Sequence, residues 1–103
     1  MLGLRTPRQR APVHPREVLL EEFLKPYGLS KRGLARGLRL SYARVLRLLR
    51  GQSRVTPDLA LRLARYFGTS PEFWLNLQLA YDLYQAEAKG DYREIEPFRP
   101  PAA

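Results

Sequence analysis

The sequence predicts an all-α protein of five helices organised around a helix-turn-helix unit. Apolar residues recur at three- and four-residue steps, the spacing of amphipathic helices, through most of the chain. Serine and threonine residues that suit helix N-caps precede several of these runs, and glycines follow them. Two of the runs are short and joined by a tight turn, which is the pattern of a helix-turn-helix.

The composition favours a polyanionic partner and excludes several kinds of site. The 103 residues carry a formal net charge of +8, which suits binding to nucleic acid. There is no cysteine and a single histidine, His14, so thiolate metal sites are excluded and a histidine zinc site or Ser/His pair is disfavoured. No apolar run approaches the ~20 residues of a membrane span, and the basic N-terminus has no secretory h-region. We expect a cytoplasmic protein that is not an enzyme, with no catalytic residue, metal, cofactor, small-molecule substrate or membrane contact.

The N-terminal part is predicted to be an arm followed by a helix. Residues 1–13 are basic and proline-bearing, and we expect a flexible arm that only meets solvent, with DNA contact as the alternative. The first helix is predicted to begin at Pro15, because proline suits the first helical position, and to end between Pro26 and Gly28. Its apolar residues are Val18, Leu20, Phe23, Leu24 and Tyr27. Its exposed face carries Glu17, Glu21 and Glu22, which either only meet solvent or contact a basic protein.

The next two helices, residues 30–38 and 41–50, form the helix-turn-helix pair. Ser41 is expected to cap the second, because its hydroxyl can accept a hydrogen bond from an early free N–H. On a wheel of 100° per residue, one side of this helix is apolar, with Val45, Leu48 and Leu49. The opposite side presents Ala43, Arg47 and Arg50, flanked by Tyr42, Arg44 and Leu46. Since arginine offers a bidentate donor to guanine or phosphate, this helix is predicted to enter the DNA major groove.

The signs of the charges support that prediction. Between residues 31 and 65 there are ten cations, and Asp58 is the only anion. A surface that is merely soluble more often mixes the two signs. The segment is therefore expected to face a polyanion.

Two further helices share one start signal: an N-cap residue, a proline at the first position and a carboxylate in the first turn. It occurs at Thr56-Pro57-Asp58 and again at Ser70-Pro71-Glu72. The fourth helix is expected to end at Gly68 and to bury Leu59, Ala60, Leu63, Ala64 and Phe67. The fifth is expected to run to about Lys89, followed by a tail over residues 91–103 that frays or drapes.

The fifth helix is apolar on more than one face, so it needs burial on more than one side. It either crosses the centre of one bundle or packs one face on the bundle and another on a second copy. We favour the second arrangement, because Trp, Tyr and Phe are frequent interface anchors. A two-fold axis would then place two recognition helices ~34 Å apart, one turn of DNA.

Several motifs occur in a fixed order along the chain. They are His14-Pro15, Phe23-Leu24-Lys25-Pro26, Gly28-Leu29-Ser30, TPDLALRLAR from Thr56 and GTSPEFWLNLQ from Gly68. This order resembles the HigA/VapI-type antitoxins, a branch of the Xre (phage-repressor-like) helix-turn-helix proteins. The resemblance extends from about Val13 to Glu87.

The resemblance implies a five-helix phage-repressor-like domain, here residues 14–90, that dimerises and binds its own operator. It also implies neutralisation of a HigB toxin, a RelE-like mRNA endonuclease, by complex formation. By position, Tyr42, Ala43 and Arg47 match base-contacting places and Lys31 a phosphate- or base-contacting place. The stretch with Phe73, Trp74 and Leu77 matches one that helps form the dimer. Arg39 stands where the turn often has glycine. Since a non-glycine residue with positive φ carries strain, we expect the turn to be either slightly different or simply less favourable.

Together these observations give three sets of candidate residues. The DNA-binding set is Lys31, Arg32, Ser41, Tyr42, Ala43, Arg44, Arg47, Arg50 and Arg54. The dimer set is Phe73, Trp74, Leu77, Tyr81 and Tyr84, and the toxin-binding set is Glu17, Glu21 and Glu22. The expected function is that of a type II antitoxin that represses its own operon. The alternatives are a stand-alone Xre-family repressor without a toxin partner and an interaction module whose DNA affinity is incidental.

Overall fold

A computed structural model describes residues 12–102, and this part of the chain is helical throughout its regular structure, with no strand. Most of the predicted N-terminal arm therefore lies outside the described residues. The first helix consists of three consecutive stretches: α1 (Pro15–Val18), η2 (Leu19–Leu24) and α2 (Lys25–Tyr27). It is followed by α3 (Lys31–Leu38), α4 (Tyr42–Leu49), α5 (Pro57–Phe67) and α6 (Pro71–Lys89). The prediction of a five-helix, all-α domain is confirmed.

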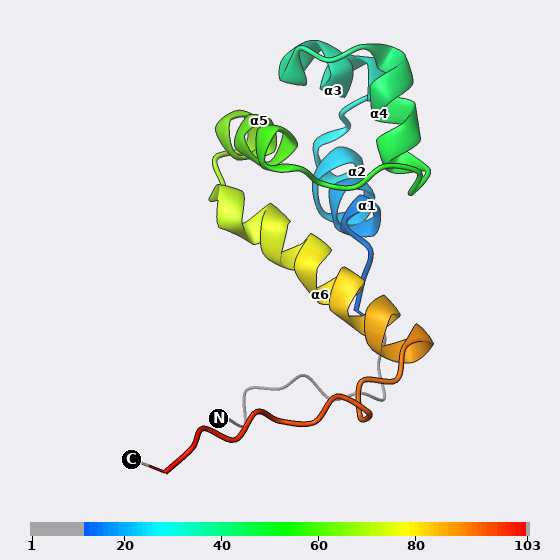
Figure 1. Cartoon of the computed structure of the whole chain (residues 1–103). Coiled ribbons are helices and arrows are strands. Elements are labelled where there is room, and N and C mark those ends of the chain that lie inside the picture. The colour runs from blue at the N-terminus through cyan, green and yellow to red at the C-terminus, as the bar shows by residue number, and fades with distance from the viewer. Residues whose placement is uncertain (1–11, 103) are drawn as a thin grey trace.

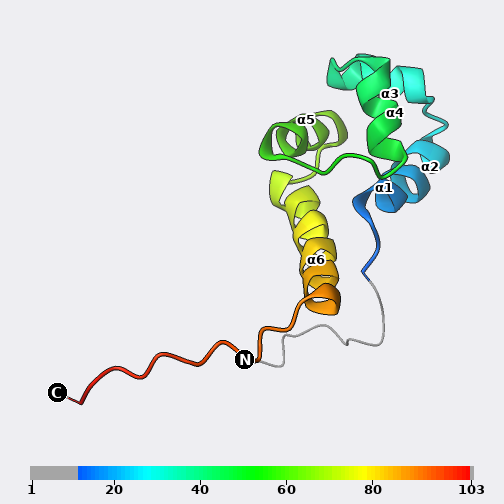
Figure 2. The ribbon, with the colours of Figure 1, turned by 45° about the vertical axis from the view of Figure 1, so that its right-hand side comes forward.

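The helix-turn-helix pair α3 and α4 forms the top of the molecule in Figure 1, above α5 and the first helix. Figure 2 shows α6 running down from the end of α5, with the C-terminal segment leading away from it. None of the helices in residues 12–102 is both long and apolar enough to cross a membrane.

The first helix contains a π-helical stretch that the sequence did not reveal. Pro26 has no N–H to donate, and its ring crowds the carbonyl one α-turn before it. In η2 the bonds are one residue longer, as where the Lys25 N–H donates to the Leu20 carbonyl. A wider turn shifts the residues that follow it around the helix axis. As a result Tyr27, which the sequence listed with the apolar residues of this helix, is 70% exposed. Leu19, at the start of the π-helical stretch, is buried.

The hydrophobic core joins all five helices. Its largest fully buried side chains include Leu19, Leu34, Val45, Leu63 and Trp74. The inward residues predicted for α4 and α5 are buried, except that Phe67 is only partly so.

The predicted helix ends are confirmed by their hydrogen bonds. The hydroxyl of Ser41 accepts from the Arg44 N–H at 3.2 Å, and that of Thr56 from the Leu59 N–H at 3.3 Å. The Ser70 hydroxyl accepts from the Phe73 N–H at 3.1 Å. Glycines with positive φ end three helices, at Gly28, Gly51 and Gly68.

The turn between α3 and α4 keeps a positive φ at Arg39, the less favourable of the two forms that the sequence left open. Arg39 lies in the left-handed region, with φ 57° and ψ 44°. The Leu40 N–H donates to the Ala35 carbonyl and the Arg39 N–H to the Arg36 carbonyl, which is the bonding of a glycine-ended helix. Arginine adopts this geometry at a steric cost that glycine avoids.

Only the first half of α6 lies in the core. Trp74 has no exposed surface, and its indole N–H donates to the Thr69 hydroxyl at 2.7 Å. Further along, Leu79 and Leu83 are 55% and 54% exposed. The side chain of Trp74, which the sequence assigned to the dimer contact, is therefore already enclosed within one protomer.

Candidate nucleic-acid interface

The outer side of α4 is basic and accessible, as the wheel predicted. Ala43, Arg44, Arg47 and Arg50 are all exposed, whereas the apolar side of the helix is buried. The helix is held in place by that apolar side and by the Ser41 cap at its start. Its arginines thus project from a firmly packed helix, which suits contacts with base edges and phosphates.

A second group lies at the starts of α3 and α4. The guanidinium carbon of Arg32 lies 4.1 Å from the centroid of the Tyr42 ring. Such a cation–π contact orients both side chains. Lys31 precedes Arg32 at the start of α3, where the Ser30 hydroxyl caps the helix by accepting from the Gly33 N–H at 2.9 Å. The sequence assigned both Arg32 and Tyr42 to DNA binding. The structure brings these two residues together from the starts of two different helices.

These cations are not neutralised by any residue in the described part of the chain. No carboxylate of residues 12–102 forms an ion pair with the cations of this surface. They are Lys31, Arg32, Arg44, Arg47 and Arg50. The starts of α3 and α4 add the positive ends of their helix dipoles. The arrangement is an electrostatic surface suited to a polyanion.

Arg54 differs from the rest of the predicted set. Its Nη1 forms an ion pair with Asp82 Oδ2 on α6 at 2.7 Å. Asp82 Oδ1 accepts from Gln78 Nε2 at 3.0 Å, and Gln78 Oε1 accepts from the Val55 N–H at 2.8 Å. This network fastens the segment after α4 to α6, so Arg54 has a structural partner that the sequence analysis missed. The signal was the polar pair Gln78 and Asp82, four residues apart among the apolar residues of α6.

Arg62, one of the cations of the basic segment, is also engaged internally. Its Nη1 donates to the carbonyl oxygens of Leu38 and Arg39 at 2.7 and 3.2 Å. Its Nε pairs with Asp58 Oδ2 at 2.9 Å. The guanidinium therefore closes the turn before α4 and is not part of the free basic surface.

His14 has a structural place at the start of the first helix. Its Nδ1 accepts from the Arg16 N–H at 3.1 Å, and its ring packs edge-on against Tyr81 with centroids 4.7 Å apart. Burial, and then the charge of Arg16, lower the pKa of His14, and Glu17 and Asp82 oppose this shift. Tyr81, predicted as a dimer contact, thus has a partner within the protomer.

The other predicted residues are distributed over two places. Glu17, Glu21 and Glu22 are exposed on the first helix, and Glu21 pairs with Lys25 at 2.7 Å. On α6, Phe73 is 39% exposed, while Leu77 and Tyr84 are partly buried.

Comparisons with known proteins find the same helix-turn-helix fold. A helix-turn-helix family model matches residues 20–74. The chain is 52% identical over 75 residues to virulence-associated protein I of Dichelobacter nodosus, covering 73% of this chain and 69% of that protein. It resembles the solved structure of the antitoxin GraA with a TM-score of 0.80 and 41% identity, covering 86% of this chain and 99% of that one. It also resembles Pseudomonas aeruginosa antitoxin HigA, solved with the higBA promoter, with a TM-score of 0.76 and 44% identity over 85% of this chain and 99% of that one.

Proposed function

Because this chain belongs to the helix-turn-helix family that includes the HigA-type antitoxins, we propose that it is a dimeric antitoxin that binds its own operator. It represses its operon through the outer side of α4 and neutralises a HigB/RelE-like mRNA endonuclease by complex formation. Residues 14–90 act as the DNA-binding and dimerisation unit, 1–13 as an arm and 91–103 as a tail. The protein acts in the cytoplasm.

One observation carries the DNA-binding part: the arginines of α4 are exposed and have no carboxylate partner in residues 12–102. The Arg32–Tyr42 contact, 4.1 Å from guanidinium carbon to ring centroid, adds an oriented group beside them. Arg47 and Ala43 are the residues we assign to base edges. Lys31, Arg32 and Arg50 are assigned to phosphates, which position the helix without reading sequence.

The test is the double variant Arg44→Ala/Arg47→Ala on a duplex that carries the chain's own promoter. We expect loss of specific binding with an unchanged circular dichroism spectrum and melting temperature, because both side chains are exposed. In the wild type, the logarithm of the binding constant should fall linearly with the logarithm of the salt concentration, with a slope of about −0.9 per neutralised phosphate.

A matched control is Arg65→Ala/Arg99→Ala, which removes the same charge from exposed positions outside α4. It should bind the promoter nearly as well as the wild type. Equal affinity of the α4 double variant and this control would exclude the groove assignment.

The dimer is proposed to form through the exposed part of α6. Leu79 and Leu83, four residues apart and more than half exposed, give this helix an apolar side that residues 12–102 leave uncovered. The variant Leu79→Glu/Leu83→Glu should be a monomer in light scattering. It should also bind the promoter more weakly, because one protomer reaches only one half-site.

The toxin part is tested by copurification of the tagged chain with a basic, RelE-like protein encoded beside it. Absence of any such complex would favour a stand-alone repressor of the same fold.

A further inference from the structure

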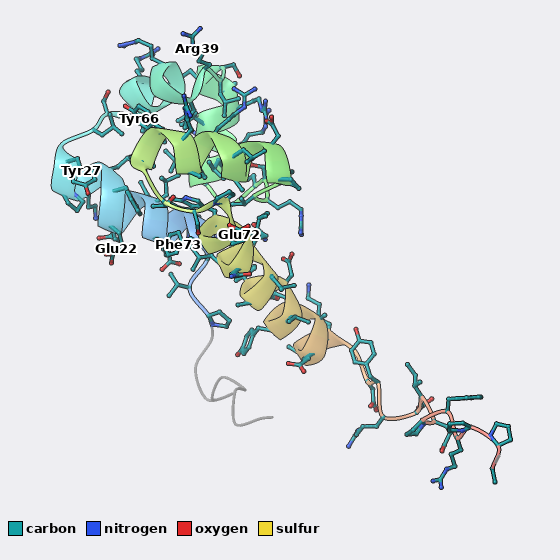
Figure 3. The ribbon with its side chains drawn as sticks, turned by 90° about the vertical axis from the view of Figure 1, so that its left-hand side faces the viewer. Glu22, Tyr27, Arg39, Tyr66, Glu72 and Phe73 are labelled. Atoms are coloured by element: carbon teal, nitrogen blue, oxygen red, sulfur yellow. The ribbon has the colours of Figure 1, made fainter. Side chains whose placement is uncertain are left out.

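The side of the bundle away from α4 carries exposed aromatic residues. Tyr27 at the end of α2 is 70% exposed, Tyr66 near the end of α5 is 42% exposed, and Phe73 in the first turn of α6 is 39% exposed. In Figure 1, α4 lies on the right, and Figure 3 views the molecule from the left. Figure 3 shows these three residues along that side, together with Glu22 and Glu72. We call these five residues the aromatic face.

The three exposed rings belong to one continuous aromatic cluster. Tyr27 contacts Phe23 with ring centroids 6.3 Å apart, and Tyr66 contacts Phe67 at 5.0 Å. Phe73 contacts Trp74 edge-on at 5.0 Å. The inner rings contact one another in turn: Phe23 lies 4.6 Å from Phe67 and 5.2 Å from Trp74. The exposed aromatics are therefore mounted on the core of the protein and lose little freedom when a partner binds.

Tyr66 is fixed on its other side as well. A Cβ placed on Gly37 of α3 would overlap the Tyr66 ring, so the ring lies directly on the helix backbone. A hollow of about 530 Å³ opens beside it, lined in part by Leu61, Arg39 and Arg65. Rigid aromatic anchors next to a hollow are the features that dominate binding energy at protein interfaces.

The five residues of the aromatic face include two carboxylates and no cation, whereas the hollow beside Tyr66 is lined by Arg39, Arg62 and Arg65 together with Asp58. Glu22 and Glu72 form no ion pair within residues 12–102. The nearest cation in the sequence, Lys25, is occupied by Glu21 at 2.7 Å. Arg16 points elsewhere, since its side chain lies about 3.1 Å from where a Cβ on Gly51 would be. In a chain of net charge +8, unpaired carboxylates thus accompany exposed aromatics on one side.

We propose that the aromatic face is the docking surface for a basic protein, which inserts cationic side chains beside Glu22 and Glu72 and apolar ones against the three rings. Under the function proposed above, on which this inference rests, that protein is the toxin. Nucleic acid does not fit, because the carboxylates repel phosphate. Since this face and α4 lie on different sides of the bundle, one protomer holds the operator and the toxin at the same time.

The probe is the HigB-type toxin expressed from the same operon, titrated against the full chain by calorimetry. A first variant, Glu22→Arg/Tyr27→Ser, changes two exposed side chains of the first helix. A second variant, Phe73→Ser, changes an exposed side chain of α6. We expect each to raise Kd at least about tenfold, as loss of interface anchors does. Promoter binding and the dimer mass should stay at wild-type values in Glu22→Arg/Tyr27→Ser. The matched control Tyr92→Ser/Glu94→Arg makes the same kinds of change in the exposed C-terminal segment and should leave Kd unchanged.

The outcomes separate the two claims. If the wild type binds the toxin and the first variant binds it equally well, the face is not the docking surface, whatever Phe73→Ser does to folding. If the wild type binds no toxin, the toxin part of the proposed function fails, and the assigned occupant fails with it. Dissociation of the dimer by Glu22→Arg/Tyr27→Ser would instead assign the face to a second copy. Release of the promoter when toxin is added would contradict simultaneous binding.

Discussion

The guanidinium Nη1 of Arg62 lies 2.7 Å from the carbonyl oxygen of Leu38, the last residue of α3. A side chain of α5 thus satisfies the end of one helix of the DNA-binding pair and the Arg39 carbonyl in the turn, 3.2 Å away. Asp58 holds the other edge of the same guanidinium at 2.9 Å. The position of α4 relative to α3 is therefore coupled to α5.

Loss of this contact should destabilise the fold without removing a DNA contact. We expect Arg62→Ala to lower the free energy of unfolding by about 1–3 kcal/mol, because hydrogen bonds from a charged donor are lost. Urea denaturation measures this change. Arg65→Ala, at an exposed position of the same helix, should change stability by less than about 0.5 kcal/mol. Equal stability of the two variants would show that the Arg62 contact contributes nothing.

The turn should become more stable with glycine. Arg39 has φ 57°, where a side chain costs about 1–2 kcal/mol that glycine does not incur. Glycine loses more entropy on folding, which offsets about 0.5–1 kcal/mol of that gain. We expect Arg39→Gly to raise the free energy of unfolding by about 0.5–1 kcal/mol, whereas Arg39→Ala should not. A thermal melt of the three proteins distinguishes these outcomes.

The buried amide of Gln78 should matter more than its polar type suggests. It is 4% exposed, and its Oε1 accepts from the Val55 N–H at 2.8 Å. In Gln78→Leu that buried donor has no partner, which costs about 1–3 kcal/mol. Hydrogen exchange at the Val55 amide should speed up in the same variant. Asn76→Leu, at an exposed position of the same helix, should leave both quantities at wild-type values.

The stability should depend on His14 below neutral pH. Burial and the charge of Arg16 lower the pKa of His14 in the folded state, and the capping bond needs Nδ1 unprotonated. The unfolded chain therefore binds the proton more tightly, with a pKa of about 6.5. The contribution of His14 is complete above that value and is lost as pH falls through the folded pKa.

We expect the free energy of unfolding of the wild type to fall as the pH is lowered from about 7.5, above the unfolded-state pKa of about 6.5, through the lowered folded-state pKa of His14. His14→Asn keeps a capping acceptor but does not titrate, so its fall over this range should be smaller. Urea denaturation at several pH values compares the two proteins. An identical pH dependence in both would exclude His14 as the titrating group.

Local features were predictable from the sequence. The caps at Ser41, Thr56 and Ser70, the strained Arg39 and the outward side of α4 all follow from residues within a few positions of one another. Helix geometry converts such spacing directly into a face or an end. The π-helical turn escaped this reasoning, because a pattern of 3.6 residues per turn assumes an unbroken helix. The α-helical pattern therefore misplaced Tyr27, which follows the π-helical turn.

The number of helices, the helix-turn-helix and the basic side of its second helix could be predicted from residues close together in the chain, because short-range periodicity and capping fix them. Which charged and aromatic residues remain available depended on the packing of the helices. This packing enclosed Trp74, engaged Arg54 and Arg62, and left Tyr27, Tyr66 and Phe73 on one side. Helices that are distant in the chain bring particular side chains together only through the way they pack. The type of a side chain alone does not specify which partner it will then meet.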